Sequence, residues 1–128
     1  MALKKSGLFL LAVLMFIVAG CSSSAGGLDE AAIEAKVVSE PAAAVAGTPV
    51  KLMTTVEGIE ALEDARIVFD IREETEEQLP TLLDATSPAE KQYETTHTFP
   101  APGKYIIYVH IYSGDDIHII KRNEFQVN

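Results

Sequence analysis

The sequence predicts an all-β fold, an immunoglobulin-like β-sandwich of about seven strands. From Ala35 onward, short segments alternate apolar and polar residues with a period of two, which is typical of half-buried strands. Turn residues such as Gly, Pro and Asp separate these segments at regular intervals. A tyrosine, Tyr105, also follows a Pro-Gly turn at the position where such sandwiches place a corner tyrosine.

Seven segments have the residue pattern of a strand. The predicted strands cover residues 35–38, 50–56, 65–72, 79–83, 93–99, 104–112 and 117–127. Pro41 ends the first strand, and Pro80 restricts the fourth to a sheet edge. In the third strand, one face holds Ile67, Phe69 and Ile71, and the other holds Arg66, Asp70 and Arg72. The acidic segments 58–64 and 73–77 are expected to be solvated loops.

The turn before Tyr105 allows the most specific prediction about the fold. Pro102-Gly103 has the residues of a type II turn. The ring of Tyr105 should then fill the core, while its hydroxyl bonds to the backbone of the corner. The chain has no tryptophan and a single cysteine, so the inter-sheet disulfide of antibody domains is absent.

The first twenty residues form a separate unit. Lys4 and Lys5 precede an apolar run from Gly7 to Val18, and Ala19-Gly20-Cys21 follows it. This arrangement resembles a bacterial lipoprotein signal peptide with its lipobox. The resemblance implies that residues 1–20 are cleaved and that Cys21 becomes a lipidated N-terminus. Residues 21–34 would be a flexible tether, and residues 35–128 a domain on the extracytoplasmic face of the cell membrane. The alternative, an uncleaved membrane anchor, is disfavoured because the run is short for a bilayer.

Charge limits the possible partners. After the leader, 8 basic residues stand against 19 acidic ones, a net charge of −11 with neutral histidines. Such a surface repels nucleic acid and anionic headgroups, so membrane attachment should come from the lipid on Cys21. The sequence contains no nucleophile elbow, phosphate loop or HExxH motif, and we expect no enzymatic activity.

Three histidines, His97, His110 and His118, are the candidate metal ligands. A two-residue turn in the last hairpin would place Ile111 opposite His118, whereas a three-residue loop places His110 opposite His118. The second register is favoured because it keeps the isoleucines on one buried face. Two opposed imidazoles suit copper(II) or zinc, with a third ligand from Asp116, a tyrosine or another copy. Ordinary cross-strand histidines remain the favoured interpretation. His97 is expected to be partly buried and not a ligand.

The same register predicts a patch on the outer side of the last hairpin. Its members are Ile106, Tyr108, His110, Tyr112, His118 and Ile120. Aromatic and apolar residues on so acidic a chain indicate a docking surface for a partner. The alternative is that the N-terminal strand or the tether covers this patch.

Several stretches together resemble one family. They are Glu40-Pro41, "AGTPV" at 46–50, "DARIVFDI" at 64–71 and "YETTHTFPAPGKYIIYVHI" at 93–111. In combination they resemble the YtkA-like domains of bacterial secreted and lipid-anchored proteins, over residues 35–128. The resemblance implies a sandwich fold and an association with copper handling, and it transfers no catalytic residue.

Two functions follow as expectations. The first is a lipid-anchored, non-enzymatic accessory domain that docks an envelope partner through Ile106, Tyr108, Tyr112 and Ile120. The second is a copper-binding or metal-delivery protein that uses His110 and His118.

Overall fold

The computed structural model describes residues 29–60, 62 and 64–128. The predicted signal peptide, Cys21 and residues 21–28 of the predicted tether lie outside the described residues. Within the described part, no helix is long and apolar enough to cross a membrane.

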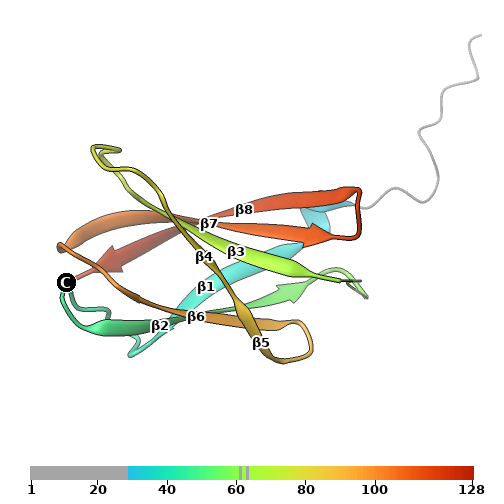
Figure 1. Ribbon diagram of the computed structural model, residues 1–128, viewed down its shortest axis with the longest axis horizontal. Coiled ribbons are helices and arrows are strands. Elements are labelled where there is room, and N and C mark those ends of the chain that lie inside the picture. The colour runs from blue at the N-terminus through green and yellow to red at the C-terminus, as the bar shows by residue number, and fades with distance from the viewer. Residues whose placement is uncertain (1–28, 61, 63) are drawn as a thin grey trace, which may run out of the picture.

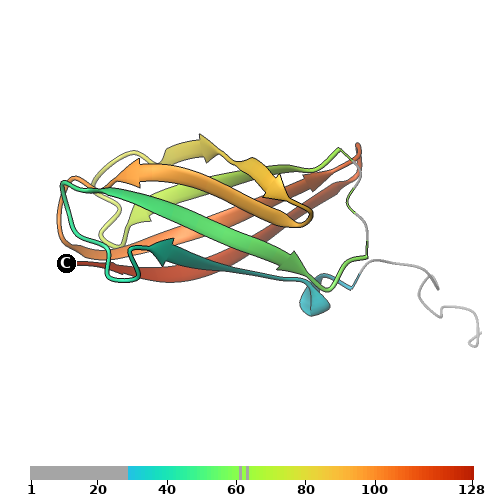
Figure 2. The same ribbon diagram turned by 90° about the horizontal axis from the view of Figure 1, so that it is seen from below.

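Two antiparallel four-stranded sheets face each other (Figures 1 and 2). The first sheet has the order β1-β2-β6-β5, with β1 at Glu34–Glu40, β2 at Pro49–Glu57, β6 at Gln92–Thr98 and β5 at Thr86–Ala89. The second has the order β4-β3-β7-β8, with β4 at Thr81–Asp84, β3 at Arg66–Glu73, β7 at Gly103–Ser113 and β8 at Ile117–Val127. A short 3₁₀ helix, η1 (Glu30–Ala32), precedes β1. This strand order is that of an immunoglobulin-like sandwich, which confirms the predicted fold.

The sequence missed one strand, β5, so the sandwich has eight strands where about seven were predicted. All four residues of β5 are exposed, and one of them is Pro88. The strand therefore shows no apolar alternation. The predicted edge strand at 79–83 appears as β4, displaced two residues toward the C-terminus at its start.

The core lies between the sheets and is built from alternate residues of the strands. The largest fully buried side chains are Phe69, Phe99, Ile33, Leu52, Ile67, Ile107, Ile111, Val50, Val56, Val109, Val127 and Asp70. All of these except Asp70 belong to the core cluster. The predicted tether, residues 21–34, includes Ile33 and Glu34, but Ile33 packs in this core and Glu34 begins β1. The sandwich therefore begins earlier than predicted.

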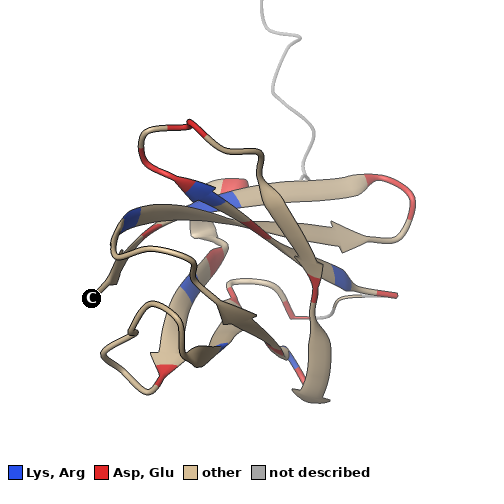
Figure 3. Cartoon of the chain, turned by 60° about the vertical axis from the view of Figure 1, so that its left-hand side comes forward, with Lys and Arg blue, Asp and Glu red and all other residues tan. Residues whose placement is uncertain are grey.

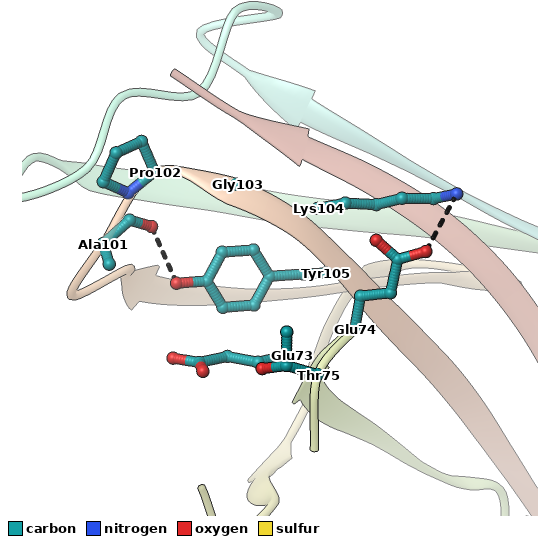
Figure 4. A pocket seen from close by; sticks show the side chains of 8 residues that line it. All are labelled: Glu73, Glu74, Thr75, Ala101, Pro102, Gly103, Lys104 and Tyr105. Atoms are coloured by element: carbon teal, nitrogen blue, oxygen red, sulfur yellow. Dashed lines mark hydrogen bonds and ion pairs between the residues drawn. The ribbon is translucent and has the colours of Figure 1, made fainter. Parts of the chain in front are cut away.

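The predicted tyrosine corner is present. The Tyr105 hydroxyl donates a hydrogen bond to the Ala101 carbonyl at 2.7 Å (Figure 4). The Tyr105 ring packs edge-on against Phe99, with centroids 4.8 Å apart. On the opposite side of β7, Lys104 reaches Glu74 at 3.5 Å, which ties the loop after β3 to β7.

One lateral side of the sandwich is closed between β1 and β8. The Asn123 side chain accepts from the Val37 amide and donates to the Ala35 carbonyl, both at 3.0 Å. Ala44 forms a parallel bridge to Val127 nearby. These bonds satisfy backbone groups of β1 that an edge strand would otherwise leave open.

Candidate functional site

The candidate site lies on the outward face of the β4-β3-β7-β8 sheet, which we call the outer face. Successive strand residues point to opposite sides, so the alternate residues of each strand that do not enter the core are found here. The members from the two central strands are Arg66, Val68, Asp70 and Arg72 on β3, with Lys104, Ile106, Tyr108, His110 and Tyr112 on β7. The flanking strands add Leu82 and Asp84 on β4, with His118, Ile120, Arg122 and Glu124 on β8. Strand β1 belongs to the other sheet and does not cover this face.

The predicted register of the last hairpin is wrong by two residues. Tyr112, not His110, lies directly opposite His118, and His110 lies opposite Ile120. The connecting loop is Gly114-Asp115-Asp116, and Gly114 has a positive φ of 57° that a glycine adopts readily. A shift of two residues preserves the face of every side chain, so the predicted division into core and outer face is unaffected.

His110 and His118 nevertheless meet, as diagonal neighbours. Nδ1 of His110 lies 3.0 Å from Nε2 of His118, and the two rings stack with centroids 5.3 Å apart. Tyr112 continues the stack, because its ring lies 4.3 Å from that of His118 at an interplanar angle of 12°. Diagonal pairs of this kind are within reach of large side chains on adjacent strands.

Beneath these rings is a buried carboxylate, Asp70, only 2 % exposed. Arg72 donates to it through two nitrogens, at 3.0 Å and 2.7 Å, and Nε2 of His110 lies 3.2 Å from Oδ2. Burial alone would raise the pKa of Asp70, but the hydrogen bonds from Arg72 and His110 outweigh it and hold that pKa below its ordinary value. The ionised carboxylate accepts only, so Nε2 of His110 donates the hydrogen bond to Asp70.

The three predicted metal ligands, His110, His118 and Asp116, do not form one group. Among the described residues, no group of three or more histidine, cysteine or acidic side chains could hold a metal ion. Asp116, the predicted third ligand, lies in the hairpin loop and is not grouped with His110 and His118. His97 is partly buried in β6, where its ring meets Phe99 edge-on at 4.7 Å, and burial lowers its pKa. The partial burial of His97 agrees with the prediction.

A hollow of about 320 Å³ opens on the outer face between β4 and β7. Val68 and Asp70 line it from β3, between Leu82 on one side and the rings of His110 and Tyr112 on the other. Arg66 and Arg72 also line it, from opposite ends of β3. The Arg66 guanidinium stands 5.7 Å from the Tyr112 ring centroid and reaches Asp84 at 2.7 Å.

Charge is distributed unevenly over the protein. The chain has three arginines, Arg66, Arg72 and Arg122, and all three lie on the outer face. In contrast, acidic residues occupy the loops that join β3 to β4 and β7 to β8 (Figure 3). Among its members named above, the outer face carries four basic and three acidic side chains, whereas the chain after residue 20 carries −11.

The predicted docking residues differ in accessibility. Ile120 is half exposed, while Tyr108 and Tyr112 are partly buried. Ile106 is only 7 % exposed, because it lies between the long side chains of Arg72 and Glu124 on the neighbouring strands. The accessible patch is therefore smaller than the predicted one at this end.

Sequence reasoning missed Asp70, Arg66 and Leu82 as members of the site. The alternation of charged residues at 66, 70 and 72 on one strand face was visible and could have indicated an ion-paired surface. The neighbours of these residues on β4 and β7 depend on strand pairing, which no local pattern specifies.

Comparisons with models of known protein families and with curated proteins give no match. The resemblance to YtkA-like domains therefore stays a prediction.

Proposed function

We propose that this protein is a lipid-anchored, extracytoplasmic docking domain without enzymatic activity, and that it binds a partner protein at the cell envelope through the outer face. In this proposal Cys21 carries the lipid, and the segment after it connects the sandwich to the membrane.

The composition of the outer face supports the proposal. Arginine and tyrosine are the residue types that most often dominate binding energy at protein interfaces. Here Arg66 and Tyr112 pack together, as do Arg72 and Tyr108 with a guanidinium-to-ring distance of 5.2 Å. The apolar side chains of Leu82 and Ile120 are 63 % and 50 % exposed at the two sides of this group. Pre-ordered rings lose little conformational entropy on binding, so such a face is suited to recognition.

Site-specific photocrosslinking tests the docking function. A photoreactive residue at position 120 of the full chain, expressed in its own envelope, should form a discrete crosslinked species. The same residue at position 38 serves as the control, because Val38 is similarly exposed but lies on β1 of the other sheet. Loss of the crosslink on a Tyr108→Ala/Tyr112→Ala background would support docking, whereas equal crosslinking from positions 120 and 38 contradicts it.

A second candidate function, binding of copper(II) or zinc, is favoured by the His110–His118 contact. Two imidazole nitrogens bound at about 2.0–2.1 Å to one ion stand about 2.8–3.4 Å apart for bond angles between 90° and 110°. The observed separation of 3.0 Å falls in this range. Asp70 would orient His110 by accepting a hydrogen bond from its other ring nitrogen, as carboxylates commonly do for metal-bound histidines. A third ligand would have to come from water or from another molecule.

Copper(II) titration of the full chain in detergent tests this candidate. We expect one-to-one binding that is lost in the His110→Ala/His118→Ala variant and retained in His97→Gln. An Asp116→Asn variant should bind as tightly as the unmodified chain, because Asp116 is not grouped with the two histidines. Equal binding by the double variant and the unmodified chain would eliminate the histidine pair as a metal site.

A further inference from the structure

We propose that the hollow between β4 and β7 binds an acidic peptide segment of the partner, with an apolar side chain above Val68 and a carboxylate on Arg66. This inference rests on the docking function proposed above and specifies the chemistry of what is docked.

The shape of the hollow favours an apolar side chain at its centre. Val68 lies in the β-ladder between Asp84 on β4 and His110 on β7, both of which have longer side chains. A short apolar residue between two longer ones leaves a depression with an apolar floor. Leu82, 63 % exposed, and the Tyr112 ring offer further apolar surface on either side. Val68 itself is only 7 % exposed, so an inserted aliphatic side chain would cover mainly the exposed surface of Leu82 and part of the Tyr112 ring. Burial of such surface favours binding.

The charged rim favours a carboxylate. Arg66 donates to Asp84 through Nε, and its two terminal nitrogens carry donors in a fork that matches a second carboxylate. Its position beside the Tyr112 ring holds the guanidinium at the edge of the hollow. Arg72 is different, because it is engaged by the buried Asp70 through two hydrogen bonds. Arg66 is therefore the arginine we assign to the partner.

The distribution of charge favours an acidic partner over a basic one. A basic segment would be attracted to the acidic loops at 73–77 and 115–116, away from the hollow. An acidic segment is repelled by those loops. On the outer face it meets all three arginines, each paired with one carboxylate, and Arg66 keeps its two terminal nitrogens for a second one. Complementary charge of this kind steers encounter and selects the partner.

Three blocked peptides of equal length test the inference: a Glu/Leu alternating sequence, its Gln/Leu counterpart and its Lys/Leu counterpart. Each is titrated into the ¹⁵N-labelled full chain in detergent micelles, and the amide signals are followed by NMR. We expect the Glu/Leu peptide to shift Val68, Leu82 and Tyr112 and to bind about tenfold more tightly than the Gln/Leu peptide, as a charge-assisted hydrogen bond implies. Its affinity should fall as salt is added.

Two matched pairs of variants locate the binding. Arg66→Gln should lower the affinity for the Glu/Leu peptide to that for the Gln/Leu peptide. Lys36→Gln, which makes the same charge change at an exposed position on β1, should leave the affinity unchanged. Leu82→Ser should weaken all binding, and Val38→Ser, which removes an equally exposed apolar side chain from the other sheet, should leave it unchanged. Thermal unfolding of each variant verifies that the fold is retained.

The outcomes separate this inference from the docking function. Equal affinity for the Glu/Leu and Gln/Leu peptides, or unchanged binding in Arg66→Gln, overturns the acidic specificity even if crosslinking at position 120 succeeds. Shifts confined to residues outside the hollow, or self-association of the chain through the outer face in sedimentation, overturn the assigned occupant. If the Glu/Leu peptide binds as expected but no crosslink forms at position 120, the docking function is contradicted instead.

Discussion

His110 Nε2 lies 3.2 Å from Oδ2 of the buried Asp70, on the strand next to it. This contact fixes the orientation of the His110 ring, and through it the stack with His118 and Tyr112. A single carboxylate thus organises the groups in both proposed functions. It is also the most deeply buried charged group among the described residues, which makes its contribution to stability measurable.

Replacement of Asp70 by Asn should destabilise the fold. The amide has nearly the same volume as the carboxylate, but it lacks the negative charge that accepts hydrogen bonds from Arg72 and His110. We expect a loss of about 1–3 kcal/mol in the free energy of unfolding, measured by urea denaturation. Asp84→Asn is the matched control, because that carboxylate also pairs with an arginine but is solvent exposed. An equal effect of both substitutions would show that burial of Asp70 contributes nothing.

The stabilising effect of Asp70 should depend on pH in one direction. Its pKa in the folded protein lies below its ordinary value, because the hydrogen bonds from Arg72 and His110 outweigh the effect of burial. The contribution is therefore fully present above the unfolded value of about 3.9 and is lost as pH falls below it. The stability difference between the unmodified chain and Asp70→Asn should therefore shrink as pH falls below about 4. A difference that grows on acidification would contradict this assignment.

Gly58 and Gly47 provide a test of close packing. Both have positive φ, 84° and 79°, so alanine at either position meets the same backbone cost of about 1–2 kcal/mol. Only at Gly58 would a Cβ overlap backbone, the Ala32 carbonyl, while the space around Gly47 is open. Gly58→Ala should therefore lower the free energy of unfolding by about 1–3 kcal/mol more than Gly47→Ala. Equal losses in thermal or chemical unfolding would mean that η1 does not pack on this turn.

Thr54 offers a stabilising substitution. Its hydroxyl is buried in β2 and has no hydrogen-bond partner among the described residues. Valine has the same shape without the polar group, so Thr54→Val should raise the free energy of unfolding by about 1 kcal/mol. Thr55→Val, at the exposed neighbouring position, is the control and should change it little. Destabilisation by Thr54→Val would show that the hydroxyl is satisfied in solution.

Removal of one oxygen atom measures how much the corner hydrogen bond of Tyr105 contributes to the free energy of unfolding. Tyr105→Phe keeps the ring packed on Phe99 and deletes the bond to the Ala101 carbonyl. The expected loss is about 1 kcal/mol in the free energy of unfolding. Tyr108→Phe, on the outer face of the same strand, should have a smaller effect. A larger loss from Tyr108→Phe than from Tyr105→Phe would contradict the structural role assigned to the Tyr105 hydroxyl.

The sequence predicted the elements whose signal is local. Alternation located β2, β3, β6, β7 and β8, and the Pro-Gly turn located the corner at Tyr105. It failed at β5, where no side chain is buried and no pattern exists. It also failed at the register of the β7–β8 hairpin, because a shift of two residues leaves the apolar face intact and only the loop geometry distinguishes the two pairings.

The all-β class, the inner and outer side of each strand, and the corner tyrosine can all be predicted from the amino-acid sequence. These depend on periodicity and turn residues, which act within a few positions of the chain. By contrast, strand pairing is required to bury Asp70, to bring it to His110 on another strand, and to place all three arginines on one face. Those relations join residues up to 56 positions apart, such as Arg66 and Arg122, and they exist only once the strands have paired.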